Sequence, residues 1–470
     1  MSLVITGATI IDGVADAPLK GHRIWIEGDR IKAIVRDGEW EKPETPVTVI
    51  EARGKYIIPG LLNANVHLSD MRTETLVRDE DRYEDLILEG AQLALKNGVT
   101  TVFDTLGPRK PLMAARDKIS QRQAPGSRIF CAGAIVGMDG PFSADQNNLA
   151  ASVLSAAVTE RINAVFVENV GPALSWMTPE QIAEEVQTYI EKGVDFIKYL
   201  GSEHRWPDPS AFLAFSPEAQ SAIVEQAHRA GLTAQAHTTA GEALRVAVEA
   251  GCDLIQHCNI TGPVPIPDST LELMAKRQTG AVIFPFTQRR FDWIMKSTID
   301  RGYWSTSDVN ARALIRSGAL ILLATDGCHF APEMATDPLW AKYWLAPGED
   351  NLNDFTQGHF TWLQAMEEKG YPAMELLRAA TINIAKAYKK DGDLGTLEAG
   401  KLADLLILDK DPLQSSANYR GIYMMLKDGV VVNRESLPQN PIYSKPRTGP
   451  SPETIAYRSQ RQKGNYPSPS

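Results

Sequence analysis

The chain has 470 residues, of which 43% are hydrophobic and 23% charged, a composition typical of a folded globular protein. Its formal net charge of −10 argues against a nucleic-acid partner, because phosphate contacts need clustered Lys and Arg. We see no signal peptide and no uncharged apolar run long enough to cross a bilayer, so we expect no membrane partner. The 4 cysteines form no Cys-x-x-Cys pair, which argues against a disulfide framework and favours the reducing cytoplasm.

Both ends of the chain carry short β-strand patterns, which predict one accessory domain. Such short strands need a partner to cover their apolar face. The strand patterns lie at residues 3–11, 23–31, 47–50, 405–408 and 424–433, with turns at Gly28-Asp29 and Asp428-Gly429. We therefore predict a small β-sandwich built from residues 1–57 and 396–470, which includes a C-terminal arm from Pro438 onward. A larger domain, residues 58–395, is inserted between these segments.

The inserted part alternates strand-like and helix-like patterns. The eight strand candidates are residues 61–67, 101–104, 128–131, 194–199, 232–237, 254–257, 281–284 and 320–326. The helix candidates are residues 83–97, 179–192, 217–230 and 307–317, the last capped by Ser307 or Asp308. This alternation predicts the α/β class and a (β/α)₈ TIM-type barrel. Residues 286–304 and 338–371 are expected to form loops over the barrel mouth, the second with a helix inside it.

Potential metal ligands stand at the ends of five of these strands. They are Asn65, His67, Lys198, His237, His257 and Asp326. Asn65 and His67 are two residues apart in a strand, so their side chains point to the same face. The C-terminal ends of barrel strands converge on one point, and imidazole and carboxylate groups suit Zn²⁺ or Co²⁺. The set as a whole therefore predicts a metal site.

Each of these residues also has a structural interpretation when it is taken alone. A single His at a strand end is more often a hydrogen-bonded structural residue, and Asp326 before Gly327 is also a common turn residue. The recurrence of ligand types at successive strand ends favours the metal site. His204 and His329 follow Lys198 and Asp326 closely, and we expect them to touch substrate or to hold a ligand in place.

Three motifs resemble the metal-dependent amidohydrolase superfamily, and the resemblance covers nearly the whole chain. They are Ile-Ile-Pro-Gly-Leu-Leu at 57–62, Gly-Val-Thr-Thr-Val at 98–102, and Asp-Leu-Gly-Thr-Leu-Glu-Ala-Gly-Lys-Leu-Ala-Asp-Leu at 393–405. The resemblance implies that Lys198 is N6-carboxylated and bridges two metals. It implies that His237 and His257 bind the second metal and that Asp326 is the catalytic acid and base.

Asn65 departs from the His-x-His motif that is usual in this superfamily. An Asn-x-His motif resembles the small group of phenylurea hydrolases and molinate hydrolase, which cleave urea and thiocarbamate herbicides. An amide oxygen is a weaker ligand than imidazole, so one or two divalent ions per subunit (Zn²⁺, Co²⁺ or another) are both compatible with the sequence.

The favoured function is therefore metal-dependent hydrolysis of a C–N bond in urea-type xenobiotics, such as phenylurea herbicides, to an aniline, an amine and CO₂. Thiocarbamate hydrolysis and a prolidase- or dipeptidase-like activity are the enzymatic alternatives. A metal-poor binding or scaffold protein is the alternative without catalysis. We expect a small-molecule substrate and a homo-oligomer.

Overall fold

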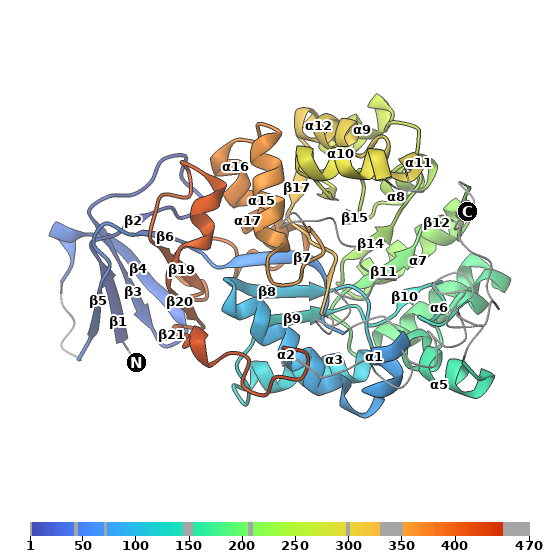
Figure 1. Cartoon of the computed structure of the whole chain (residues 1–470), viewed down its shortest axis with the longest axis horizontal. Helices are drawn as coiled ribbons and strands as arrows, with labels where there is room; N and C mark the ends of the chain where they lie inside the picture. Colours follow the sequence, from blue (N-terminus) through green and yellow to red (C-terminus); the bar gives the residue numbers. More distant parts are fainter. Residues whose placement is uncertain are drawn as a thin grey trace.

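The computed structural model describes residues 2–41, 46–69, 73–143, 154–204, 210–297, 301–329 and 351–444. Figure 1 shows strands from both ends of the chain side by side at the left and a larger, helix-rich part at the right. In the part of the chain that is described, no helix is long and apolar enough to cross a membrane.

The strands from the two ends of the chain form two sheets. One has the order β4-β3-β1-β5 and the other the order β2-β6-β19-β20-β21. The strands are β1 Ser2–Thr6, β2 Thr9–Ile10, β3 His22–Glu27, β4 Arg30–Arg36, β5 Thr48–Glu51, β6 Tyr56–Pro59, β19 Leu405–Leu408, β20 Ile422–Lys427 and β21 Val430–Val431. Side chains from both sheets, such as Ile5, Ile24, Ile57 and Leu405, share one buried apolar cluster. Burial of this cluster holds segments that are far apart in the sequence together.

The remaining strands form two further sheets and a hairpin. The sheets have the orders β18-β7-β8-β9 and β10-β11-β14-β15-β16-β17, all strand pairs within them are parallel, and β12 and β13 form the hairpin. The strands are β7 Leu61–His67, β8 Val99–Asp104, β9 Arg128–Cys131, β10 Ile135–Val136, β11 Ile197–Leu200, β12 Ser202–His204, β13 Ala211–Leu213, β14 Ala234–His237, β15 Leu254–Gln256, β16 Gly280–Val282, β17 Leu320–Leu322 and β18 Gly327–Cys328.

Backbone hydrogen bonds join these two parallel sheets at both edges. The Asp195 N–H donates to the Cys131 carbonyl at 2.9 Å, next to β11 and β9. The Ala64 N–H of β7 donates to the Leu323 carbonyl, directly after β17, at 3.0 Å. The strand ends that carry the predicted site therefore belong to one continuous hydrogen-bonded framework.

Helices surround this framework (Figure 1). They are α1 Thr73–Arg78, α2 Tyr83–Lys96, α3 Arg109–Ser120, α5 Ala156–Val167, α6 Pro179–Ile190, α7 Pro217–Arg229, α8 Gly241–Glu249, α9 Asp268–Arg277, α10 Gln288–Ser297, α11 Arg301–Trp304, α12 Ser307–Ser317, α15 Gly358–Glu368, α16 Ala373–Ala379 and α17 Ile382–Ala387. Helix α6 starts at a capping box, in which Thr178 and Gln181 bond each other's backbone N–H groups. The 3₁₀ segments are η1 Asp37–Glu39, η2 Glu80–Arg82, η3 Pro172–Trp176, η4 Ser416–Arg420 and η5 Arg434–Ser436.

The structure differs from the sequence prediction in three local features. Residues 286–304, expected as a loop, contain helices α10 and α11. The predicted strand 320–326 ends at Leu322, so Asp326 lies in an irregular segment before β18. Helix α12 begins after Thr306 without a side-chain cap, so neither Ser307 nor Asp308 caps it. Residues 330–350 and 445–470, which hold part of the predicted second loop and of the arm, lie outside the described residues.

Candidate metal and catalytic centre

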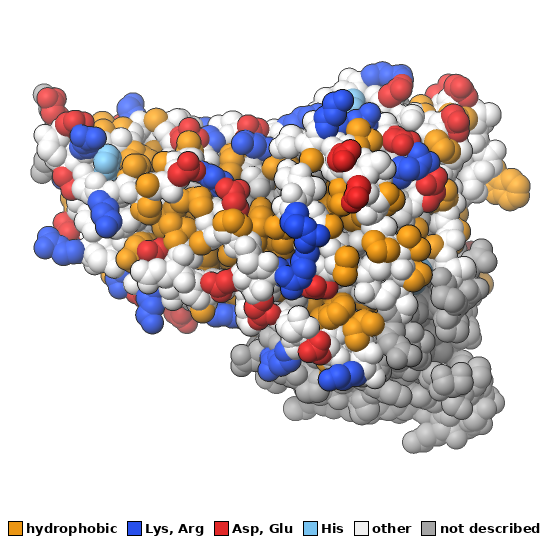
Figure 2. Space-filling model, turned by 90° about the horizontal axis from the view of Figure 1, so that it is seen from above, with side chains coloured by type: hydrophobic (Ala, Val, Ile, Leu, Met, Phe, Trp, Pro, Cys, Tyr) orange, Lys and Arg blue, Asp and Glu red, His pale blue; other side chains and the backbone are white. Residues whose placement is uncertain are grey.

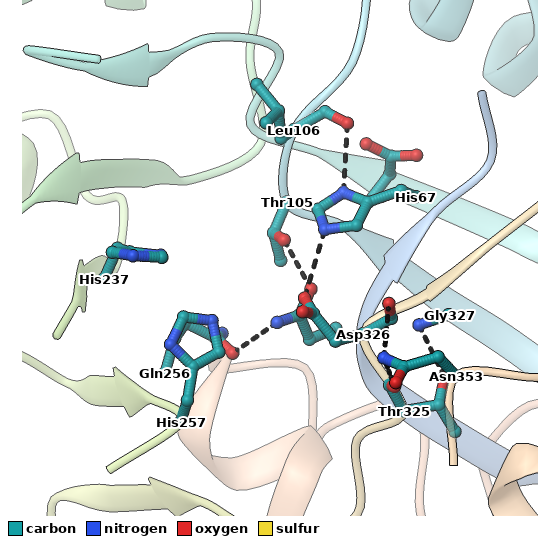
Figure 3. Close-up of polar contacts among 12 residues, drawn as sticks. His67, Thr105, Leu106, His237, Gln256, His257, Thr325, Asp326, Gly327 and Asn353 are labelled. Atoms are coloured by element: carbon teal, nitrogen blue, oxygen red, sulfur yellow. Dashed lines mark hydrogen bonds and ion pairs between the residues drawn. The ribbon is translucent and has the colours of Figure 1, made fainter. Parts of the chain in front are cut away.

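The strand ends place the predicted site residues around one region of the molecule. His67 ends β7, Lys198 lies in β11, and His237 ends β14. His257 directly follows β15, and Asp326 lies in the irregular segment between β17 and β18; their φ angles are positive, 44° and 48°. Such left-handed backbone costs a non-glycine residue about 1–3 kcal/mol, and it is often found at functional sites. Figure 3 shows His67, Asp326, His237 and His257 around the same space.

His67 and Asp326 form a direct pair. The His67 Nε2 atom lies 3.1 Å from Asp326 Oδ1, and His67 Nδ1 lies 3.1 Å from the Leu106 carbonyl (Figure 3). Burial opposes ionisation of Asp326, but the hydrogen bond with His67 and the nearby Lys198 hold its pKa well below the usual range. At neutral pH the Asp326 carboxylate is therefore ionised and able to accept a proton.

The Asp326 segment is attached to β7 by backbone and amide contacts. The Asp326 N–H donates to the Asn65 carbonyl at 2.9 Å. Asn63 Oδ1 accepts the Thr325 N–H at 3.2 Å, and Asn63 Nδ2 donates to Thr325 Oγ1 at 2.9 Å. Pairing of β7 with β8 is irregular between Asn63 and Val66. These contacts fix Asp326 relative to His67 although the residue lies outside a strand.

His237 and His257 form a second pair. Their ring centroids are 4.4 Å apart, and the rings meet edge to face. His257 Nδ1 lies 3.4 Å from the Thr238 carbonyl. Burial, together with the nearby His237, lowers the pKa of His257 to about 3, so this imidazole is neutral at physiological pH. Neutral imidazole is the form that binds metal ions.

Glu203 of β12 is a site residue that the sequence analysis missed. Its Oε2 atom lies 3.1 Å from His237 Nε2, and its Oε1 atom lies 2.6 Å from His204 Nδ1. Burial disfavours its charge, but His237 and His204 hold its pKa well below the usual range. The available signal was an acidic residue directly before a candidate His, in the segment that follows the Lys198 strand.

Lys198 and Asn65 meet at the hydroxyl of Thr105, a second missed residue. Lys198 Nζ donates to Thr105 Oγ1 at 3.0 Å, and Thr105 Oγ1 donates to Asn65 Oδ1 at 2.5 Å. Burial lowers the pKa of Lys198 to about 8, against the opposing charges of Asp326, Asp104 and Glu203. At neutral pH the uncharged amine is therefore a much larger fraction of Lys198 than of an exposed lysine.

A buried chain of amide groups fixes the orientation of Asn65. Asn65 Nδ2 donates to Gln256 Oε1 at 2.9 Å, and Gln256 in turn donates to Gln235. Gln235 Nε2 donates to the Tyr388 hydroxyl at 3.1 Å, and that hydroxyl donates to the Ala64 carbonyl at 2.7 Å. The chain leaves the oxygen of Asn65 directed toward Thr105. The sequence gives no periodic signal for such a network.

His204 and His329 occupy different surroundings. The ring of His204 lies tilted by 34° against that of Tyr303, at a centroid distance of 4.2 Å, and contacts Glu203. His329 Nε2 lies 3.4 Å from Glu89 Oε2, and its ring packs 5.2 Å from that of Tyr443. The His329 N–H donates to the His67 carbonyl at 3.0 Å. His204 thus lies next to the pair of His237 and His257. The His329 ring faces helix α2, and only the backbone of His329 contacts His67.

The donor set fits a divalent metal ion in its chemistry. Within the described residues, no three His, Cys, Asp or Glu side chains already converge as a metal site, so ligands would come from the two neighbouring pairs. Ligating histidines usually direct their second ring nitrogen toward a carbonyl or carboxylate. His67 Nδ1 and His257 Nδ1 face carbonyls, and His237 Nε2 faces Glu203. This leaves His257 Nε2 and His237 Nδ1 for a metal, whereas His67 Nε2 contacts Asp326, which is itself a proposed ligand.

Comparison with known proteins shows what this chain resembles. The model of the Amidohydrolase family matches residues 56–433. A solved structure of molinate hydrolase is 34% identical, with a TM-score of 0.90, and the match covers 96% of this chain and 98% of that one. Phenylurea hydrolase B is 33% identical, with a TM-score of 0.88, and the match covers 95% and 100%.

A curated relative of a different activity also matches most of the chain. The 5-methylthioadenosine/S-adenosylhomocysteine deaminase of Caldanaerobacter subterraneus subsp. tengcongensis is 22% identical over 433 residues, which cover 87% of this chain and 85% of the relative. The family model and the two solved structures imply a TIM-barrel fold of mixed α and β content. They also confirm the resemblance stated from the sequence motifs.

Proposed function

Because this chain belongs to the amidohydrolase family, we propose that it is a metal-dependent hydrolase of urea-type substrates, with phenylureas as the favoured class. The family and the two hydrolase structures support a hydrolase that acts on C–N bonds. The finer substrate assignment depends on one observation. A chain about one third identical to phenylurea hydrolase B over nearly its full length carries the Asn65-x-His67 motif beside an ionised Asp326.

The proposed metal site consists of Asn65, His67, Lys198, His237, His257 and Asp326, for one or two divalent ions such as Zn²⁺ or Co²⁺. These ions, when bound, supply Lewis acidity that polarises a carbonyl group and acidifies water. A urea carbonyl is a poor electrophile because both nitrogens donate electron density to it. This chemical need supports a metal-dependent reaction.

Asp326 is the proposed proton carrier. Its carboxylate is ionised and held by His67 at 3.1 Å, so it can take a proton from water as the new C–O bond forms. The same proton then passes to the leaving nitrogen as the C–N bond breaks, which releases an amine and a carbamic acid. Loss of CO₂ from the carbamic acid frees the second amine. For an aryl urea the products are an aniline, an amine and CO₂.

Lys198 is proposed to be N6-carboxylated. Formation of the carbamate needs the neutral amine, which attacks CO₂ and loses one proton. The lowered pKa of about 8 supports this step. An ammonium group at this place would repel a metal ion, whereas a carbamate would bind it. The Thr105 hydroxyl lies 3.0 Å from Nζ and has a single proton, so it donates to a carbamate oxygen only by giving up its bond to Asn65.

Aromatic side chains near the site support an apolar or aryl substrate. Tyr303 packs against His204 at a centroid distance of 4.2 Å, Trp304 meets Tyr303 edge to face at 4.8 Å, and Phe286 meets Trp304 at 5.1 Å. His204 contacts Glu203, which contacts His237. This series of rings leads from the proposed metal ligands toward helix α11. Apolar and aromatic lining is typical of sites for small organic ligands.

We further infer that one part of the chain closes into a barrel and that the other forms a β-sandwich. Hydrogen bonds at both sheet edges support an eight-stranded barrel from residues 58–395, and the shared apolar core supports a β-sandwich from residues 1–57 and 396–470. A cytoplasmic homo-oligomer remains part of the proposal. Its location is supported by four free cysteines, three of which are buried.

The experiment is a hydrolysis screen with aryl ureas, thiocarbamates and acyl dipeptides, read by the amine released. Preferred cleavage of aryl ureas supports the proposal. Preferred cleavage of a thiocarbamate supports the second candidate, which the likeness to molinate hydrolase favours. Cleavage of dipeptides alone would overturn the urea assignment. Purified protein that retains no divalent metal and cleaves none of the three classes would point to a binding or scaffold role.

A further inference from the structure

Glu203 links two histidines through its two carboxylate oxygens. Oε2 faces His237 Nε2 at 3.1 Å, whereas Oε1 accepts the backbone N–H of His204 at 2.8 Å and lies 2.6 Å from His204 Nδ1. Glu203 is only 7% exposed. It lies in the middle of β12, where it pairs with Phe212 of β13. The carboxylate is therefore held from the His204 side by a hairpin and is directed at His237.

His237 differs from the other two histidines of the proposed metal site. His67 and His257 each place Nδ1 near a backbone carbonyl, which fixes the ring and its tautomer. Neither ring nitrogen of His237 makes a well-aligned hydrogen bond with a described residue, and the close contact of Nε2 is with the Glu203 side chain. The Glu203 side chain thus lies at His237 where backbone carbonyls lie at His67 and His257.

We propose that Glu203 is the positioning residue of His237, a role that rests on the proposed metal-dependent function. In this role the 3.1 Å contact becomes an aligned hydrogen bond from His237 Nε2–H to the carboxylate, which places the lone pair on Nδ1 and fixes the ring for ligation. Carboxylate partners of ligating histidines orient the ring and raise its basicity, and their loss typically lowers metal affinity by roughly 10–100-fold. Glu203 itself is not a ligand in this proposal.

Two variants separate an oriented hydrogen bond from simple filling of space. Glu203→Met removes the acceptor and keeps a similar volume, whereas Glu203→Gln keeps an acceptor oxygen without the charge. Glu225→Gln is the matched control, because Glu225 is exposed and pairs with Arg229 on helix α7. Circular dichroism reports whether each variant folds. If the Met variant fails to fold, the Gln variant is judged against wild type in the same measurements.

The first measurement is the tautomer of His237 in the metal-stripped full chain, by ¹⁵N NMR with a His237→Gln sample for assignment. The wild type should show Nε2–H, and Glu203→Met should shift His237 toward a tautomer mixture. Glu203→Gln should retain more of the Nε2–H form. An unchanged tautomer in both variants would overturn the proposal. This measurement does not depend on metal binding, so it stands even if the proposed function fails.

The second measurement is the affinity for Zn²⁺ and Co²⁺, by competition with a chelator of known affinity. We expect a loss of roughly 10–100-fold for Glu203→Met, a smaller loss for Glu203→Gln, and no change for the control. Equal affinities in wild type and both variants would refute the positioning role. Wild-type protein that binds neither ion would instead refute the metal-dependent function, and the tautomer result would then show whether Glu203 still orients His237.

Discussion

Asp326 is the residue on which the proposed chemistry depends most directly. Asp326→Asn removes the proton acceptor but keeps the shape of the side chain and the backbone contact with Asn65. We expect turnover to fall by at least ~10²-fold, because this is the usual scale of a lost general base. The fold should be kept, and metal content should fall far less than turnover, because an amide oxygen still occupies the ligand position. Turnover close to that of wild type would remove Asp326 from the mechanism.

Asn65 tests the unusual first motif. The bond from Nδ2 to Gln256 at 2.9 Å orients its amide, and one lone pair of its oxygen accepts from Thr105 while the second stays available to a weak metal contact. We expect Asn65→Ala to lower metal affinity at one site and Asn65→His to raise metal retention. Titration of metal into chelator-stripped wild type and both variants measures this. Equal affinities in all three proteins would show that Asn65 serves only the buried amide chain.

Lys198 tests the proposed carbamate. Intact-mass measurement under native conditions, or electron density, should show an added carboxyl group on Lys198 in metal-loaded protein. Lys198→Ala should lose metal and recover part of it with added short carboxylates, which replace the missing oxygen ligands. An unmodified Lys198 in fully metal-loaded protein would contradict the proposal. Thr105→Val, which removes the 3.0 Å contact with Nζ, should lower the carboxylated fraction.

Among the elements, regular strands and helices are the features that the sequence predicted best. Residues 61–67, 128–131 and 405–408 match strands β7, β9 and β19, because alternating or continuous apolar runs end at clear breaks. The six proposed ligands also came from strand ends alone. The regular pattern brings the ends of neighbouring parallel strands to the same edge of a sheet, but it places Asp326 in a strand that ends at Leu322 in the structure.

The apolar patterns of the sequence did not predict the irregular elements. Residues 286–304 were predicted as a loop because they are rich in aromatic and charged residues, yet the Thr287 hydroxyl accepts the Arg290 N–H at 3.2 Å and starts helix α10. Glu203 lies in a three-residue strand that pairs with β13, and no periodicity can show so short an element. The amide chain below Asn65 depends on contacts between residues nearly 200 positions apart in the sequence.

The short helix α11 contributes Trp304 to the aromatic side of the proposed site. Trp304 meets Phe286 at 5.1 Å and Tyr303 at 4.8 Å, so Trp304→Ala should weaken the aromatic side of the site. We expect kcat/KM for an aryl urea to fall at least ~10-fold, since burial of an aromatic ring is worth about 1.5–3 kcal/mol. A dialkyl analogue should lose less.

Trp176 provides the matched control for that variant. It is 91% exposed in η3, so Trp176→Ala should leave both substrates unchanged. Trp304→Phe should restore most of the aryl preference because it retains a ring. Equal losses for the aryl and dialkyl substrates in Trp304→Ala would mean that Trp304 supports the fold of the segment rather than the choice of substrate.

The whole molecule is acidic, and its charges are mixed. On the face seen in Figure 2, Lys and Arg side chains lie among Asp and Glu side chains of the described residues instead of gathering by sign. This distribution agrees with the expectation, still untested, that nucleic acid is not a partner. One acidic group has a different role, because it connects the C-terminal segment to helix α2 close to His329.

That group is Glu89 of helix α2, which receives the segment that ends at Ser444. Glu89 Oε2 accepts the N–H groups of Ile442 and Tyr443 at 3.0 Å, and Oε1 accepts the Ser444 N–H at 2.8 Å and its hydroxyl at 2.6 Å. Burial disfavours the charge, but these donors and His329 lower the pKa of Glu89 to about 2. The carboxylate thus holds the C-terminal segment against α2.

The sign of the resulting pH dependence follows from this lowered pKa. A carboxyl group of ordinary pKa near 4.3 in the unfolded chain binds protons before the folded one does. The stabilisation by Glu89 is therefore complete above about pH 4.3 and is lost as the pH falls toward about 2.

Glu89→Gln, which cannot ionise, should lower the free energy of unfolding at pH 7 by about 1.5–3 kcal/mol, the scale of a hydrogen bond to a charged group. Urea unfolding of wild type, Glu89→Gln and the exposed control Glu225→Gln at pH 7, 5 and 3 measures this difference. The difference in unfolding free energy between wild type and Glu89→Gln should be constant from pH 7 to 5. It should be smaller at pH 3, where the stabilisation by the Glu89 carboxylate is partly lost. A difference that stays the same at pH 3, or that Glu225→Gln also shows, would mean that the charge of Glu89 does not hold the C-terminal segment in place.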